Sequence, residues 1–131
     1  MSMPKSGGTQ TVLATLPGYS ANFAMDEGRI YLGDTGTLAG TGQVVSVAKT
    51  GGPLTTVVAN MDGVLAITVN ASCIYWTTPY LTVNELRAVP KSGGDPITIT
   101  PVEMSGAALA ADESGVYWEE SSTHSLMRAT K

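Results

Sequence analysis

The sequence predicts an all-β chain made of three copies of one repeating unit, and two recurring patterns carry this prediction. The first is a Lys-x-Gly-Gly motif that begins at Lys5, at Lys49 and at Lys91, in steps of 44 and 42 residues. The second is an aromatic triplet in the same steps: Ile-Tyr-Leu at 30–32, Ile-Tyr-Trp at 74–76 and Val-Tyr-Trp at 116–118. Two independent patterns at one spacing indicate an internal repeat.

The repeat divides the chain into units at about 3–46, 47–88 and 89–131. Lys131 returns to the position of the motif lysine, so all four lysines stand at one point of the repeat. We interpret them as markers of a turn, because they are spread along the chain and form no basic patch.

Each unit is expected to hold four short strands, because segments rich in Thr, Val, Ile and Tyr alternate with turn residues. The first segment follows the glycine turn at Gln10–Ala14, Leu54–Val58 and Ile97–Thr100. The second is small and apolar, which fits a buried strand, at Ala21–Met25, Leu65–Val69 and Ala107–Ala111. The third contains the aromatic triplet, and the fourth lies at Val44–Val47, Glu85–Val89 and Leu126–Ala129.

One segment has a competing interpretation. Met104–Glu113 is rich in alanine and could form a helix by itself. Its counterpart Leu65–Val69 is rich in β-branched residues, and Gly106 also disfavours a helix. The repeat therefore favours a strand.

The turns have a recognisable chemistry. The Gly-Gly pairs provide positive φ angles for tight connections between neighbouring strands. Asp26, Asn70 and Asp112 open the segment before each aromatic triplet, where such side chains bond their own backbone. We interpret both features as structural and not as catalytic.

Four strands in a unit of about 40–45 residues are typical of a blade of a β-propeller. The Val-Pro-Lys-Ser-Gly-Gly run at 89–94 and the Val-Tyr-Trp triplet at 116–118 resemble the repeats of bacterial NHL-like and YWTD-like six-bladed propellers. The resemblance implies a β-propeller with three four-stranded blades per chain. It also implies a secreted or periplasmic origin, although residues 1–8 contain no apolar stretch typical of a signal peptide.

Three blades do not close a ring, since propellers have four to eight. In this strand order each blade takes its outermost strand from the following unit. The third blade then lacks one strand, and Gln10–Ala14 has no blade in its own chain. We expect a head-to-tail homodimer that forms one six-bladed ring by exchanging these strands, with a nine-bladed homotrimer as the alternative. We also expect the chain to be a fragment of, or a design from, a larger propeller.

Two classes of loop share one face in propellers of this strand order, and that face generally binds partners. The candidate ligand-binding residues on it are Tyr19, Asp34, Asp62, Tyr80, Glu103, Glu119 and His124. Their acidic and aromatic character suits a protein or glycan ligand. A binding module is therefore the alternative to a self-assembling scaffold.

Composition argues against other classes. Seven Lys and Arg against eleven Asp and Glu exclude the basic face that nucleic acid requires, and no apolar run is long enough to span a membrane. His124 is the single histidine and Cys73 the single cysteine. We therefore predict no catalytic residues, no metal and no cofactor, with Cys73 buried. A metal-dependent lyase, as some similar propellers are, is the weakest hypothesis.

Overall fold

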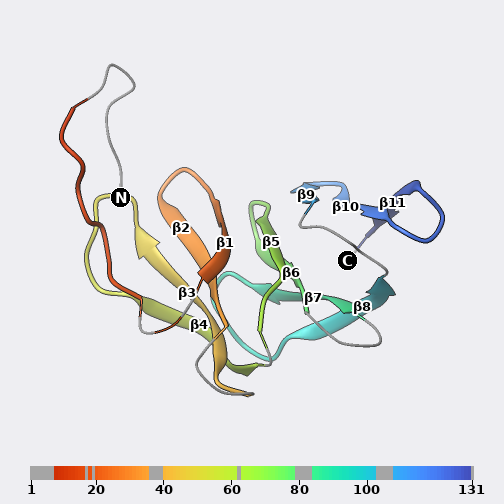
Figure 1. Ribbon diagram of the computed structural model, residues 1–131, viewed down its shortest axis with the longest axis horizontal. Coiled ribbons are helices and arrows are strands. Elements are labelled where there is room, and N and C mark those ends of the chain that lie inside the picture. Colours follow the sequence, from red (N-terminus) through yellow and green to blue (C-terminus); the bar gives the residue numbers. More distant parts are fainter. Residues whose placement is uncertain are drawn as a thin grey trace.

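The structure is a computed structural model that describes residues 8–16, 18, 20–35, 40–61, 63–78, 84–102 and 108–130. This part of the chain contains eleven strands and no helix, which confirms the all-β prediction. The strands form three antiparallel sheets that follow one another in chain order, from the orange strands to the blue ones (Figure 1).

The sheets repeat one strand order. The first sheet is β1 (Ser20–Met25), β2 (Arg29–Asp34), β3 (Gly42–Ala48) and β4 (Thr55–Met61). The second is β5 (Ala66–Val69), β6 (Cys73–Thr77), β7 (Asn84–Pro90) and β8 (Ile97–Val102). The third has three strands, β9 (Leu109–Asp112), β10 (Gly115–Glu120) and β11 (Ser125–Ala129).

This order agrees with one detail of the prediction, that the strand after a glycine turn pairs with the strand before it. β4 and β8 follow the next glycine turn and complete the preceding sheet, as predicted for the outermost strands. Within the described residues, no fourth strand pairs with β11. Residues 10–14, which were expected to be a strand, belong to none of the three sheets, and Thr11 makes one isolated bridge. Leu109–Asp112 is a strand and not a helix, while residues 103–107 lie outside the described residues.

The turns use the predicted chemistry. Gly51 and Gly93 have φ angles of 88° and 91°, and the residue after each is also positive. Their amides donate to the carbonyl oxygens of Ala48 and Pro90 at 2.8 and 2.9 Å. Asp26 accepts hydrogen bonds from two amides of its own turn. Asn70 and Asp112 do the same.

Two apolar layers hold the sheets together. Between the first two sheets the layer includes Tyr31, Val44, Ile74 and Trp76. Between the second and third sheets it consists of Cys73, Tyr75, Leu86, Ala88, Val102, Val116 and Trp118. These clusters confirm that Tyr31, Tyr75, Trp76 and Trp118 pack between sheets and that Cys73 is buried. Tyr117, which was expected to pack in the same way, lies in neither cluster because no described sheet follows the third. The first strand of each sheet contacts that of the next, β1 with β5 and β5 with β9.

Candidate assembly interface

The two ends of the row of sheets leave apolar side chains uncovered. On the first sheet, Phe23 and Met25 are 55% and 51% exposed. They share a face with Ile30, Leu32 and Val47, because cross-strand partners point to the same side. We call this set the outer face of the first sheet.

The third sheet has its own uncovered side. Leu126 is 81% exposed and lies on the side of the sheet that carries Tyr117 and Ala110. The opposite side, with Val116 and Trp118, packs on the second sheet. We call the set Ala110, Tyr117 and Leu126 the open face of the third sheet.

The equivalent positions in the first and second sheets are buried. Val44, Leu86 and Leu126 each pair with the residue that follows an aromatic triplet, and Leu86 is 0% exposed. Leu86 is covered because the third sheet packs against it, whereas no described residue covers Leu126 in this way. Full burial of such a side chain is worth about 1.5–3 kcal/mol.

The same comparison applies at the other end. Phe23 pairs with Leu32 of its triplet, and Ile67 of the second sheet pairs with Trp76 in the same way. Ile67 is 5% exposed because it packs on the first sheet. The outer face of the first sheet is therefore the counterpart of a face that elsewhere in the chain covers the preceding sheet.

A groove of about 500 Å³ runs over the outer face of the first sheet. Leu13, Ala14 and Leu16 line it from the N-terminal segment. The carbonyl oxygen of Leu13 accepts a long hydrogen bond of 3.4 Å from the amide of Gly52. The segment therefore lies beside the first sheet without extending it.

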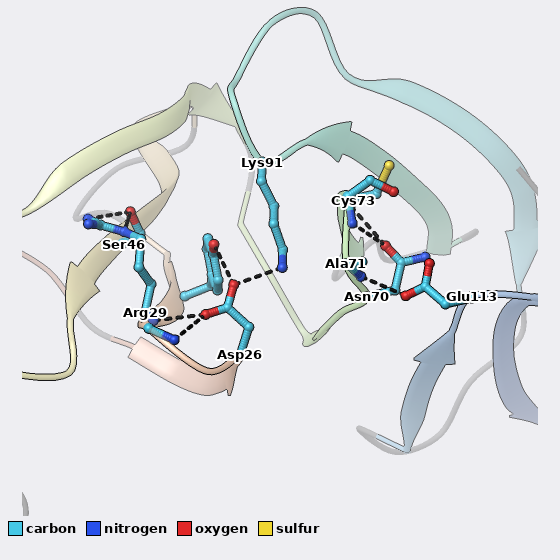
Figure 2. A network of polar contacts seen from close by, with 11 residues as sticks. Asp26, Arg29, Ser46, Asn70, Ala71, Cys73, Lys91 and Glu113 are labelled. Carbon is cyan, nitrogen blue, oxygen red and sulfur yellow. Dashed lines mark hydrogen bonds and ion pairs between the residues drawn. The ribbon is translucent and has the colours of Figure 1, made fainter.

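A polar contact bridges the turns of the first two sheets (Figure 2). Lys91 Nζ donates to Asp26 Oδ2 at 2.8 Å and lies 5.4 Å from the centre of the Tyr31 ring. The Tyr31 hydroxyl donates to the same carboxylate oxygen at 3.0 Å. Above all through the hydrogen bond from Lys91, this environment holds the pKa of Asp26 well below its usual range. Burial, followed by the bond to Asp26, raises the pKa of Tyr31 to about 12.

A second polar contact joins the second and third sheets (Figure 2). Asn70 Nδ2 donates to the carbonyl oxygen of Asp112 at 3.1 Å. The amide of Ala71 donates to Glu113 Oε1 at 2.9 Å. Residues of the Asp/Asn turns therefore make polar contacts across both junctions between sheets.

Three of the predicted ligand-binding residues are described by the structure. Asp34 ends β2 and is buried, and its carboxylate accepts a hydrogen bond from Gln43 at 3.1 Å. A Cβ on Gly18 would collide with this carboxylate, so backbone covers it. Glu119 is exposed on β10, and His124 is exposed in the turn before β11 with a φ of 51°. The burial of Asp34 favours a structural role for that residue.

The other four candidates, Tyr19, Asp62, Tyr80 and Glu103, lie outside the described residues. The structure therefore describes three of the seven residues of the predicted ligand face, Asp34 on the first sheet and Glu119 and His124 on the third. In the described ranges, no group of three or more His, Cys, Asp or Glu side chains could hold a metal ion. Within the same limits, no helix is long and apolar enough to cross a membrane.

The sequence interpretation missed the polar contact that joins the first two sheets. It treated the motif lysines only as turn markers, although Lys91 bridges two sheets. One signal in the sequence could have revealed this contact. The motif lysines and the turn residues Asp26, Asn70 and Asp112 share one repeat spacing, which is what a lysine-to-turn contact between consecutive sheets requires. No protein-family model matches the chain, and no curated protein matches it.

Proposed function

We propose that this protein is a self-assembling half of a β-propeller, in which two copies join head to tail to close a six-bladed ring without enzymatic activity. One observation carries the proposal: Leu126 is 81% exposed at a position where Leu86 is fully buried. A position that is buried when a further sheet follows suggests that another sheet covers it in the assembled protein.

The two ends have complementary patterns. The outer face of the first sheet corresponds to the face with which the second sheet covers the first. The open face of the third sheet corresponds to the covered face of the second. If the first sheet of one copy packs on the third sheet of another, it forms a junction of the kind found twice within the chain.

The N-terminal segment supplies the missing strand in this arrangement. β4 and β8 directly follow a Lys-x-Gly-Gly turn, and residues 10–14 follow the same motif. We propose that this segment pairs with β11 of the next copy, which gives the third sheet four strands. It leaves the groove on its own first sheet in doing so, and this exposes the face that the partner covers.

The mass in solution tests the proposal. Light scattering coupled to size exclusion should give 27 kDa, twice the 13.5 kDa of the chain. A mass near 40 kDa indicates the nine-bladed trimer, which retains head-to-tail closure but not the six-bladed ring. A stable, folded species of 13.5 kDa at all concentrations contradicts the proposal.

A matched pair of variants locates the contact. Leu126→Glu places a charge on the open face of the third sheet, where the side chain is exposed in the single chain, and it should give a folded monomer. Ile97→Glu makes the same kind of change at a 49% exposed position on the second sheet, and it should leave the mass at that of the wild type. Equal masses for the two variants would contradict the assignment of the interface.

A further inference from the structure

The Lys91–Asp26 contact joins a lysine on one sheet to an acid on the sheet before it. Lys91 follows β7 of the second sheet, and Asp26 precedes β2 of the first. The Lys91 side chain is 18% exposed, and its ammonium lies both on the carboxylate and beside the Tyr31 ring. This geometry is the pattern for a contact between consecutive sheets.

The chain contains a second lysine in the same local setting. The amide of Lys49 donates to the carbonyl oxygen of Gly28 at 3.0 Å, as that of Lys91 does to Ser72 at 2.9 Å. Lys49 therefore stands at the same place on the first sheet as Lys91 on the second. Its side chain is exposed and, among the described residues, makes no hydrogen bond or ion pair.

The matching acid lies at the opposite end of the row. Asp112 accepts hydrogen bonds from the amides of Ser114 and Gly115, so it holds the same turn as Asp26. Tyr117 corresponds to Tyr31, and its hydroxyl lies 3.5 Å from Asp112. No cation of the described residues pairs with Asp112; Arg128 lies near the Tyr117 ring but donates to the carbonyl oxygen of Ser114.

We infer that Lys49 of one copy binds Asp112 of the next copy and lies against its Tyr117, so that assembly completes the bridge left open at both ends. This inference rests on the proposed function, because the two residues meet only when the first sheet of one copy follows the third sheet of another. The ligand is a second copy of this chain. The bridge fixes which end of the chain meets which, since a lysine stands at one end and an acid at the other.

The junction between the second and third sheets provides a second contact whose equivalent would form between copies. Glu113 of the third sheet accepts a hydrogen bond from the amide of Ala71 on the second. Glu27 occupies the equivalent position on the first sheet, is exposed, and makes no side-chain hydrogen bond within the described ranges. In the same head-to-tail arrangement, the Glu27 carboxylate of one copy accepts a hydrogen bond from the backbone amide of Glu113 in the other copy. The junction between copies thus combines the lysine–acid contact of the first inner junction with the amide–glutamate contact of the second.

Substitutions that preserve the turn test the bridge. Asp112→Asn removes the charge and keeps the turn, because Asn70 holds the equivalent turn with its amide oxygen. Lys49→Met removes the ammonium and keeps a long aliphatic chain. Each variant should raise the dissociation constant of the assembly about three- to tenfold at low salt, and the double variant should raise it no further than the stronger single one.

Charge reversal gives a rescue experiment. Lys49→Glu faces Asp112 with a like charge and should weaken assembly more than Lys49→Met does. Asp112→Asn added to Lys49→Glu should recover part of this loss. The wild-type dissociation constant should rise with salt, and that of the Lys49→Met, Asp112→Asn double variant should rise less steeply. Asp95→Asn, which neutralises an exposed acid in the connection between β7 and β8, is the control and should leave assembly unchanged.

The outcomes separate the inference from the function on which it rests. If the wild-type protein stays monomeric, the proposed function fails. If it assembles and all Lys49 and Asp112 variants keep the wild-type dissociation constant, the bridge is wrong and the half-ring stands. If the single losses simply add in the double variant, the two residues act separately and the bridge is also wrong.

Discussion

The junction between the second and third sheets and the open face of the third sheet contain the same strand pattern. Side chains at the junction are buried, whereas those on the open face have no described sheet packed against them. Leu86 lies at the first and Leu126 at the second, with 0% and 81% exposure. Both residues are leucine, so the difference in exposure comes from what packs against them. Burial in this protein is therefore a property of position in a row of sheets, and a further sheet can complete it.

The largest expected change in stability comes from making one substitution, Leu to Ala, at both positions. Leu86→Ala should cost about 2–5 kcal/mol in the free energy of unfolding, because it removes buried methyl groups and leaves a cavity. Leu126→Ala should cost less than about 0.5 kcal/mol in the dilute monomer, where its side chain is exposed. Urea denaturation at low protein concentration measures both. Similar losses in the two variants would show that Leu126 is covered within a single chain.

Leu126→Ala should also weaken assembly, which Leu86→Ala affects only through folding. Light scattering over a concentration series measures this second effect. An unchanged dissociation constant for Leu126→Ala would remove the open face of the third sheet from the interface.

The glycine turns provide a test in which the first and second sheets should behave alike, although the first is at an end of the row and the second is not. Gly93→Ala, in the turn beside Lys91, and Gly51→Ala, in the turn beside Lys49, each force a side chain into positive φ. Each should cost about 1–2 kcal/mol of stability, since the strain is local and independent of what covers the sheet. Gly28→Ala, which lies in an open turn with no neighbour within 4 Å, is the control and should cost less. Thermal unfolding of the three variants checks this, and a much smaller loss at Gly51 would contradict it.

The smallest expected change in stability is its dependence on pH through Asp26. The pKa of Asp26 is depressed in the folded protein, first by Lys91, so its contribution is present above the unfolded pKa of about 4. It is lost as the pH falls from there toward the lower folded value. Asp26→Asn should cost up to about 1 kcal/mol at pH 7 and progressively less below pH 4, because wild type then loses the same contribution. Urea denaturation between pH 7 and pH 2.5 measures it, and a stability difference that does not vary with pH would contradict it.

Much of the fold follows from local sequence. The aromatic triplets, the Gly-Gly turns and the turn residues Asp26, Asn70 and Asp112 recur in step, and each fixes a strand or a turn by short-range chemistry. The strand exchange between units was also predictable, because β4 and β8 come directly after the glycine turns. The sequence did not predict that Asp34 is buried, since its cover comes from Gly18 and Gln43, which lie elsewhere in the chain.

The candidate interface was harder to predict than the strands. Leu86 and Leu126 are the same residue at the same pairing position, and the arrangement of whole sheets gives them different exposure. Lys91 and Asp26 are 65 positions apart, and their contact depends on the packing of two sheets. Periodicity identifies equivalent positions, whereas three-dimensional packing decides which of them meet.

Head-to-tail closure by strand exchange is tested by hydrogen–deuterium exchange followed by mass spectrometry, at protein concentrations below and above the dissociation constant. We expect peptides covering β11 and residues 10–14 to gain protection together when the protein assembles, while those covering β8 keep their protection. Assembly that protects neither β11 nor residues 10–14 would contradict head-to-tail closure by strand exchange.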